Sequence, residues 1–130
     1  MGVLCLLLDK KKQYFHLLAD IFNVTGHKLL IALEEEKAFE FLQVSSPEVL
    51  LLPIEDMDFW FKALKAGAHL IPIFFVEEYE EADSLRKYGL REPLCFLKVL
   101  RLIKEVRKVI GEKVQTYKNL AHITKKPLPV

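Results

Sequence analysis

Charged side chains follow three of the apolar runs in this 130-residue chain, and they are the residues best suited to chemistry. Asp9 follows the first run, Glu77 follows the run that ends at Val76, and Lys98 follows a short run that begins at Leu94. If these runs are parallel strands, their carboxyl ends meet at one edge of a sheet, where open α/β proteins bind ligands. Two carboxylates and one ammonium group at that edge could form a pocket for a small ligand or a metal ion, which is one of two alternatives weighed below.

The sequence offers little support for other chemistries. Its histidines and cysteines lack the spacing of metal ligands, and both cysteines lie in apolar runs, as buried reduced thiols do; these residues are His16, His27, His69, His122, Cys5 and Cys95. The chain has no nucleophile elbow, no glycine-rich dinucleotide loop and no P-loop. We therefore expect neither an enzyme nor a bound cofactor.

The composition indicates one domain with a substantial core, because 52% of the residues are hydrophobic and 28% are charged. With 19 basic and 18 acidic residues, the formal net charge is +1, which gives no electrostatic reason to expect binding to nucleic acid or an anionic membrane. No apolar run approaches the roughly 20 residues that a membrane-spanning helix needs, so we expect a cytoplasmic protein. Many Lys and Glu residues with only 2 Met indicate a thermophile.

Short apolar runs alternate with amphipathic segments, a pattern typical of a parallel sheet with helices on both faces. The expected strands are 3–8, 28–33, 49–52, 71–76 and 94–97, and the expected helices are 12–22, 34–42, 59–65, 80–88 and 100–117. This order predicts an α/β fold: a flavodoxin-like, doubly wound (βα)5 domain with a central five-stranded parallel sheet in the order 2-1-3-4-5. We expect this domain to cover residues 1–118, and residues 119–130 to form a C-terminal tail or the start of a linker.

In order and spacing, five segments resemble a response-regulator receiver domain over about residues 2 to 115; they are Leu6-Leu7-Leu8-Asp9, Gly26–Ala32, Pro47–Leu52, Ile71–Val76 and Leu94–Lys98. The resemblance implies a pocket with an acidic pair after the first strand and a phosphoacceptor aspartate after the third. It also implies a Ser or Thr after the fourth strand and a lysine after the fifth. In such a pocket the carboxylates hold Mg²⁺, and the metal and the lysine offset the charge of the phosphoryl group.

This sequence departs from that pattern at three of the five positions. Asp9 matches the first acid, but Lys10 stands where the second acid belongs, and Pro53 stands where the phosphoacceptor belongs. Glu77 takes the place of the hydroxyl residue, and Lys98 is kept. The resemblance therefore implies a degenerate pseudo-receiver that lacks its phosphoacceptor aspartate.

Two readings of this altered pocket remain open. Lys10 and Lys98 could form internal ion pairs with Asp9 and Glu77, or these side chains could point into solvent, where exposed pairs contribute only about 0 to 1 kcal/mol. Acidic residues beyond the third strand could also act as displaced acceptors, although helix capping explains the two aspartates better; these residues are Glu55, Asp56 and Asp58.

The surface offers candidate interface residues. In receivers the fourth helix, fifth strand and fifth helix form the usual partner face, and one of three consecutive aromatic residues on the third helix must face outward. The candidates are Trp60, Tyr79, Tyr88, Leu100, Ile103, Val106 and Ile110. The wide apolar stripe of the last helix is read either as core-facing with snorkelling basic residues or as partly buried against a second subunit.

These observations predict a phosphorylation-independent pseudo-receiver in two-component signalling or transcriptional control. It would act through protein–protein interaction, with a partner protein or as a homodimer, and without membrane or nucleic acid. The alternative is an atypical receiver or flavodoxin-like domain that binds a small ligand or metal at Asp9, Glu77 and Lys98.

Overall fold

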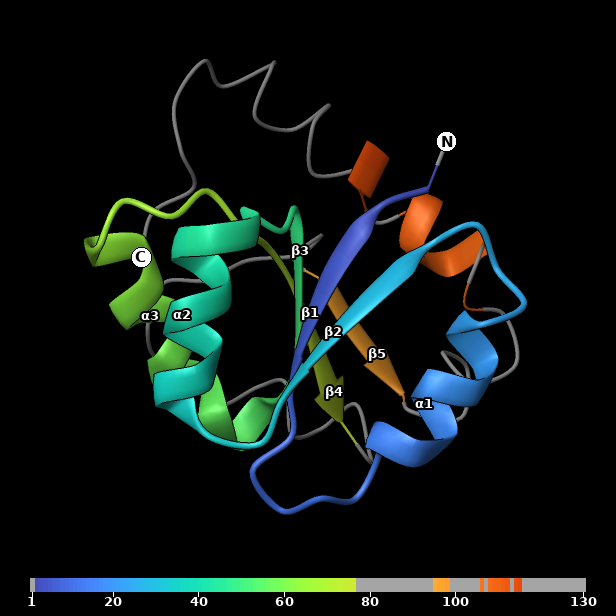
Figure 1. The fold of residues 1–130 in the computed structure, drawn as a ribbon, viewed down its shortest axis with the longest axis horizontal. Helices are drawn as coiled ribbons and strands as arrows, with labels where there is room; N and C mark the ends of the chain where they lie inside the picture. Colours follow the sequence, from blue (N-terminus) through green and yellow to red (C-terminus); the bar gives the residue numbers. More distant parts are fainter. Residues whose placement is uncertain (1, 77–94, 99–105, 107, 113, 116–130) are drawn as a thin grey trace.

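The computed structural model describes residues 2–76, 95–98, 106, 108–112 and 114–115, with only the backbone described for residues 95–98 (Figure 1). Its elements, in chain order, are β1 (Leu4–Leu8), α1 (Phe15–Phe22), β2 (Lys28–Ala32), α2 (Glu35–Ser45), β3 (Val49–Pro53), the 3-10 turn η1 (Ile54–Asp56), α3 (Met57–Lys65), β4 (Ile71–Val76) and β5 (Cys95–Lys98). Residues 106, 108–112 and 114–115 are helical. The expected helix over 80–88 and the expected tail over 119–130 lie outside the described residues.

The strands form one parallel sheet in the order β2-β1-β3-β4-β5. The register places Leu6 beside Leu30 on one side and beside Leu50 on the other. The predicted α/β class with a parallel sheet is confirmed. Because every strand runs the same way, the loops that follow β1, β2, β3 and β4 gather at one edge of the sheet.

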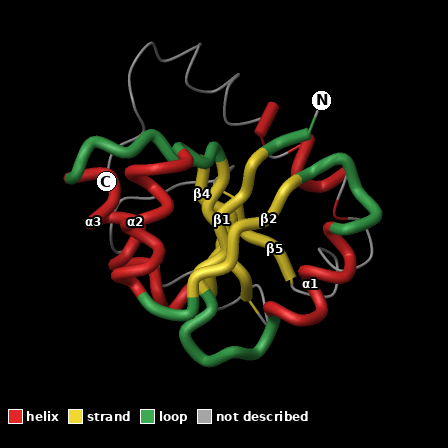
Figure 2. The backbone as a smooth tube through the Cα atoms, viewed as in Figure 1, coloured by secondary structure: helices red, strands yellow, loops and turns green. Residues whose placement is uncertain are grey.

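The strands are buried because helices cover both faces of the sheet (Figure 2). Alternate residues of β1 and β3 point to opposite faces, as a pleated strand requires, so Leu7 and Leu8 enter different cores. One core contains α1 and the helical residues after 105, and its buried members include Leu18, Phe22, Val106, Val109 and Ile110. The other core contains α2 and α3, and its buried members include Ala38, Phe59, Trp60 and Ala63.

Helices α2 and α3 each end close to a residue with a left-handed backbone. Ser46 follows α2 with φ 47°, and Gly67 lies beyond α3 with φ 91°. Helix α1 begins at Phe15, three residues later than expected, because the chain before it folds into a loop in which Lys12 has φ 57°. This loop carries the lysine residues of the candidate site.

Three of the expected interface residues lie in the core, so that prediction is wrong for them. Trp60 is 1% exposed and packs edge-on against Phe74, with ring centroids 5.7 Å apart. It is buried because α3 inserts both Phe59 and Trp60 between α2 and β4, which leaves Phe61 as the partly exposed ring. Val106 and Ile110 are also buried, at 3% and 0% exposure, which favours the core-facing reading of the last helix at these two positions.

Candidate functional site

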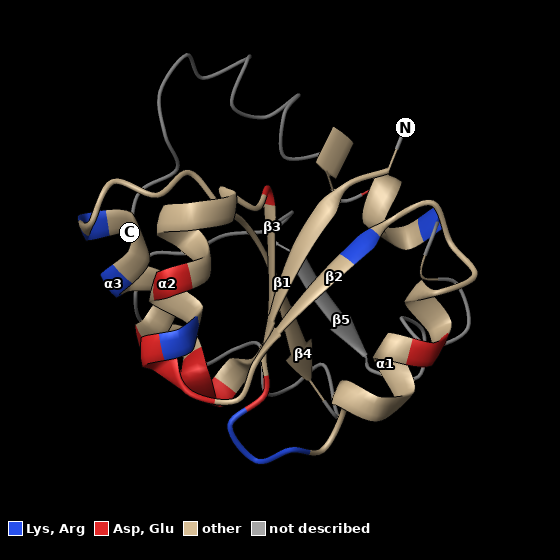
Figure 3. Ribbon diagram, viewed as in Figure 1, with Lys and Arg blue, Asp and Glu red and all other residues tan. Residues whose placement is uncertain are grey.

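The candidate site is the edge of the sheet where the strands end, and charged residues gather there (Figure 3). Asp9 and Lys10 follow β1, Glu35 begins α2, and Asp56 ends the turn that follows β3. Their places follow from the chain order, because parallel strands deliver all these loops to the same edge. Side-chain contacts then decide which residues act together.

The carboxylate of Asp9 is turned toward the start of α1. Its Oδ1 accepts the backbone N–H of Gln13 at 3.0 Å, and its Oδ2 accepts those of Tyr14 and Phe15 at 2.9 Å each. The side chain is 1% exposed, so these bonds form away from water. A carboxylate at this place satisfies amides that have no partner within the helix, and it also complements the positive end of the helix dipole. Asp9 therefore anchors the loop to α1.

Lys10 connects three loops of this edge. Its Nζ lies 3.0 Å from Glu35 Oε2 and 3.5 Å from Asp56 Oδ1. The other oxygen of Glu35 accepts a hydrogen bond from Lys62 Nζ at 3.0 Å, so α3 joins the same group. We call Lys10, Glu35, Asp56 and Lys62 the edge network. It ties the segments after β1, β2 and β3 to one another.

Of the two readings left open by the sequence, the one with ion pairs holds for Lys10, but its partners are Glu35 and Asp56 rather than Asp9. The reading in which Lys10 pairs with Asp9 is wrong, because backbone amides occupy both oxygens of that carboxylate. Glu77 lies outside the described residues, so its pairing stays a prediction. The missed partner, Glu35, had a signal in the sequence, because it starts the helix after a strand that ends at the same edge.

The edge network shifts the pKa of its members in different directions. The hydrogen bond from Lys10, and then that from Lys62, holds the pKa of the Glu35 carboxyl below its usual value. The same bond to Glu35 raises the pKa of Lys10. Burial raises the pKa of Asp56, although Lys10 acts against that shift. The side chains of Lys10 and Glu35 are 42% and 28% exposed, so each pair contributes only about 0 to 1 kcal/mol. Each pair therefore restrains the loops that it joins by no more than about 1 kcal/mol.

Pro53 ends β3 and offers no group that can accept a phosphoryl group. Its backbone is extended, with φ −62° and ψ 148°, and it lies in register with Phe75 of β4. The chain then turns through η1 directly into α3, where Asp56 takes the N-cap position without a side-chain capping hydrogen bond. The prediction that Asp56 caps this helix through its side chain is therefore wrong, since that carboxylate faces Lys10. Asp58 lies within the first turn of α3 and is exposed.

A cleft of about 230 Å³ lies beside Pro53, between the loop after β1 and the ends of β3 and β4. Its lining residues are Lys11, Gln13, Tyr14, Pro53, Ile54, Glu55, Phe75 and Val76. The rings of Tyr14 and Phe75 meet edge-on with centroids 5.6 Å apart, and an ion pair of 3.0 Å joins Lys11 Nζ to Glu55 Oε2. This lining is aromatic and zwitterionic, so it differs from the acidic cluster that would bind Mg²⁺.

Several predicted site residues cannot be placed beyond their backbone. Lys98 is the last residue of β5, in register with Val76, and its side chain is not among those described, so its role stays a prediction. Four candidate interface residues also fall outside the described residues; they are Tyr79, Tyr88, Leu100 and Ile103. Within residues 2–76 and the short stretches described beyond them, His, Cys, Asp and Glu form no group of three that could hold a metal ion.

Comparisons with known proteins show the fold. The chain is similar to a response regulator from Thermotoga maritima, with a TM-score of 0.64 and 12% identity over 85% of this chain and 99% of that one. It is also similar to a chain in which a trimeric coiled coil of yeast Spc42 is fused to another protein, with a TM-score of 0.74, 17% identity, and 96% and 83% of the two chains covered. No protein-family profile and no curated protein sequence matches.

A third similar structure is much longer than this chain. NtrX from Brucella abortus, solved in complex with ATP, matches with a TM-score of 0.68 and 18% identity over 100% of this chain but 31% of its own. Together these similarities establish a receiver-like fold. In the part of the chain that the structure describes, no helix is long and apolar enough to cross a membrane.

Proposed function

We propose that this chain is a phosphorylation-independent receiver-like domain that acts as a protein–protein interaction module in signal transduction or transcriptional control. The observation that carries the proposal is the pairing of Lys10 Nζ with Glu35 and Asp56, at 3.0 Å and 3.5 Å. A side-chain cation paired with these carboxylates would compete with a metal ion for them. Asp9, bound to three amides, and Pro53, which has no carboxylate, support the same proposal.

The edge network gives this proposal a mechanism. In a switchable receiver, a metal ion and a phosphoryl group change which loops are held together at this edge. Here side chains of the protein already join the segments after β1, β2 and β3. A domain held in one arrangement would present a constant surface to its partner. We infer that this surface includes Tyr79, Tyr88, Leu100 and Ile103, either against a partner protein or in a homodimer.

The test is an amide NMR titration of the purified chain with Mg²⁺ and then with Mg²⁺ plus beryllofluoride, a phosphoryl mimic. We expect no saturable shifts at the amides of residues 9–13 or 54–57, and no added phosphoryl mass after incubation with a small phosphoryl donor. Light scattering on the same sample should report a dimer. Saturable shifts at these residues would refute the inert pocket, and a monomer would leave the partner-protein form of the proposal as the one to pursue.

A second candidate function comes from the cleft beside Pro53. Its volume of about 230 Å³, its aromatic wall of Tyr14 and Phe75, and the Lys11–Glu55 pair at its mouth would suit a small ligand with an apolar body and a charged group. Such a ligand would move the amides of Gln13, Tyr14 and Glu55 without any need for Mg²⁺. A small-molecule fragment screen by the same NMR method distinguishes this function from the first.

A further inference from the structure

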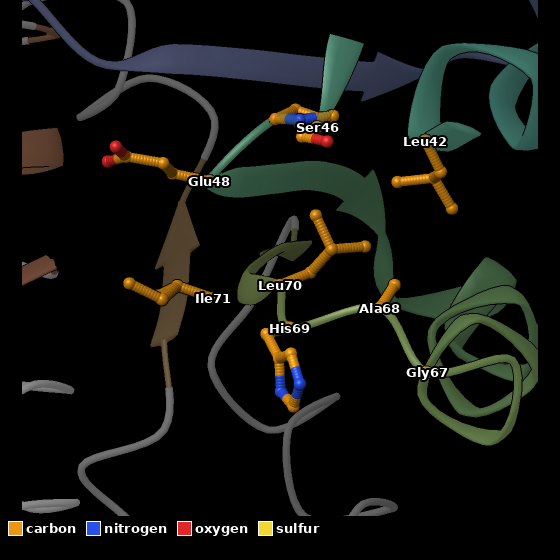
Figure 4. A pocket seen from close by; sticks show the side chains of 9 residues that line it. Leu42, Ser46, Glu48, Gly67, Ala68, His69, Leu70 and Ile71 are labelled. Carbon is orange, nitrogen blue, oxygen red and sulfur yellow. The ribbon is translucent and has the colours of Figure 1, made fainter. Parts of the chain in front are cut away.

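A groove of about 500 Å³ lies at the opposite edge of the sheet, where β3 and β4 begin (Figure 4). It lies between the ends of α2 and α3, and its lining residues are Leu42, Ser46, Pro47, Glu48, Gly67, Ala68, His69, Leu70 and Ile71. The left-handed backbones of Ser46 and Gly67 turn the chain from each helix toward the next strand and so shape its rim. The proposed function makes no use of this groove.

The groove combines apolar walls with negative electrostatic character. Leu42 lines its wall beside Leu70, which is only 2% exposed. Two helices end at the groove; the last turn of α3 carries Lys62 and Lys65, whereas that of α2 has no basic residue, so uncompensated partial negative charge comes from the last carbonyls of α2. Glu48 is exposed at its rim and forms no ion pair within the part of the chain described here. A ligand that fits this character is a short segment with cationic and apolar side chains.

The chain itself contains such a segment. Residues 116–130 carry three lysines and no acidic residue, and they end in the sequence Thr-Lys-Lys-Pro-Leu-Pro-Val. The other 115 residues contain 16 basic and 18 acidic residues, so the two parts have opposite net charges, +3 and −2. The segment and the rest of the chain therefore attract each other electrostatically.

The topology allows this segment to reach the groove. A helix that follows a strand of a parallel sheet returns to the edge where strands begin, and the last described helical residues lie there (Figure 1). Val114 packs in the same core as Val3, which precedes β1. From Gln115, an extended stretch of ten residues spans up to roughly 33 Å, about the width of a small domain.

We propose that residues 124–130 bind this groove in cis. Lys125 and Lys126 would face Glu48 and the carbonyl end of α2, and Leu128 would lie against Leu42. Weak contacts suffice for such binding, because a tethered segment has an effective concentration of about millimolar.

The test compares amide NMR spectra of the full chain and of a Lys125→Glu, Lys126→Glu double variant. These substitutions lie far from the groove in sequence and outside the described core, so folding is preserved and shift changes report docking. Apart from the substituted residues and their neighbours in sequence, we expect changes confined to residues 42–46, 48 and 67–71, toward the spectrum of a chain shortened after Gln115. Loss of two favourable charges should lower the bound-to-free ratio by about two- to fivefold per charge. Unchanged groove amides in the double variant would overturn the proposal.

A charge swap and a dilution series complete the test. Glu48→Lys should release the segment from the normal chain and should restore docking when combined with the double variant. Glu36→Lys is the matched control, because Glu36 is also exposed but lies at the start of α2, at the other edge. Groove shifts that vary with protein concentration would show that a second copy supplies the segment, and that result would overturn docking in cis.

Discussion

Replacing Asp9 by alanine gives the most direct test of the candidate site. The free energy of unfolding should fall if Asp9 anchors the loop, and should stay the same or rise if Asp9 is a free acid in a metal-free pocket. In the structure it accepts three backbone N–H groups at 2.9 to 3.0 Å and is 1% exposed. Asp9→Ala leaves these amides without their acceptor, in a place where water has little access. If Asp9 instead stood free among the acids of a metal-free pocket, its removal would relieve repulsion and leave stability unchanged or increased.

The expected loss follows from the bonds removed. Loss of a capping side chain costs about 0.5 to 2 kcal/mol, and hydrogen bonds to a charged group contribute about 1.5 to 3 kcal/mol each before any relaxation. Since the three bonds share one carboxylate and the loop can relax, we expect a total of about 3 kcal/mol in the free energy of unfolding. For a domain of this size that lowers the melting temperature by about 10 °C. Asp9→Asn keeps one acceptor oxygen and should lose about half as much.

The assay is urea unfolding followed by circular dichroism, with thermal unfolding on the same samples. Asp20→Ala is the matched control, because Asp20 is an exposed aspartate on α1 and has no hydrogen bond or ion pair within the described residues. We expect that variant to stay within about 0.5 kcal/mol of the parent. An Asp9→Ala variant as stable as Asp20→Ala, or more stable than the parent, would refute the anchoring role and favour a free acidic pocket.

Three further predictions follow from the described side chains. Lys10→Gln should raise the pKa of Glu35 toward its usual value and raise the pKa of Asp56 further, as measured by carboxyl ¹³C titration. The free energy of unfolding should fall by no more than about 1 kcal/mol. Unchanged pKa values for both carboxyls would contradict the edge network. Trp60 fluorescence should resist acrylamide quenching equally at all protein concentrations, because the core rather than a second subunit buries the ring. Burial raises the pKa of Cys5 to about 12, so the unfolded chain alone loses this proton above about pH 9. Stability should therefore fall from about pH 9 to pH 12, and Cys5→Ala should fall less steeply over that range.

The strands could be predicted well from the sequence because their signal is local and strong. Runs such as Val49–Leu52 and Ile71–Val76 are apolar on both faces, which only a strand covered on both sides can use. Helix starts were less certain. The predicted start near Lys12 missed Phe15, because the loop before it is organised by the Asp9 carboxylate, a contact that periodicity does not reveal.

The sequence predicted which residues lie at the carboxyl edge of the sheet, but not which of them form ion pairs with one another. Chain order fixed Asp9, Lys10 and Pro53 at the carboxyl edge, since each follows a strand of a parallel sheet. Which acid Lys10 meets depends on the path of the loop and on side-chain rotamers, and neither follows from residue spacing. Trp60 was misplaced for a related reason: a helix inserted between another helix and a strand can bury two neighbouring rings, whereas a single apolar stripe would bury one.

The residues at this edge, Asp9, Lys10 and Pro53, are best explained as a group. A metal ion would need carboxylates free to turn toward it, but Asp9 is bound to α1, and Lys10 holds Glu35 and Asp56. Restoring an aspartate at Pro53 alone would add a carboxylate to an edge where Lys10 and Lys62 already balance the charges of Glu35 and Asp56. The ammonium group of Lys10 provides one positive charge permanently, whereas Mg²⁺ provides two reversibly, and only the reversible charge can act as a switch. At this edge the chain's own side chains pair with one another, and this pairing is what supports the proposed phosphorylation-independent role.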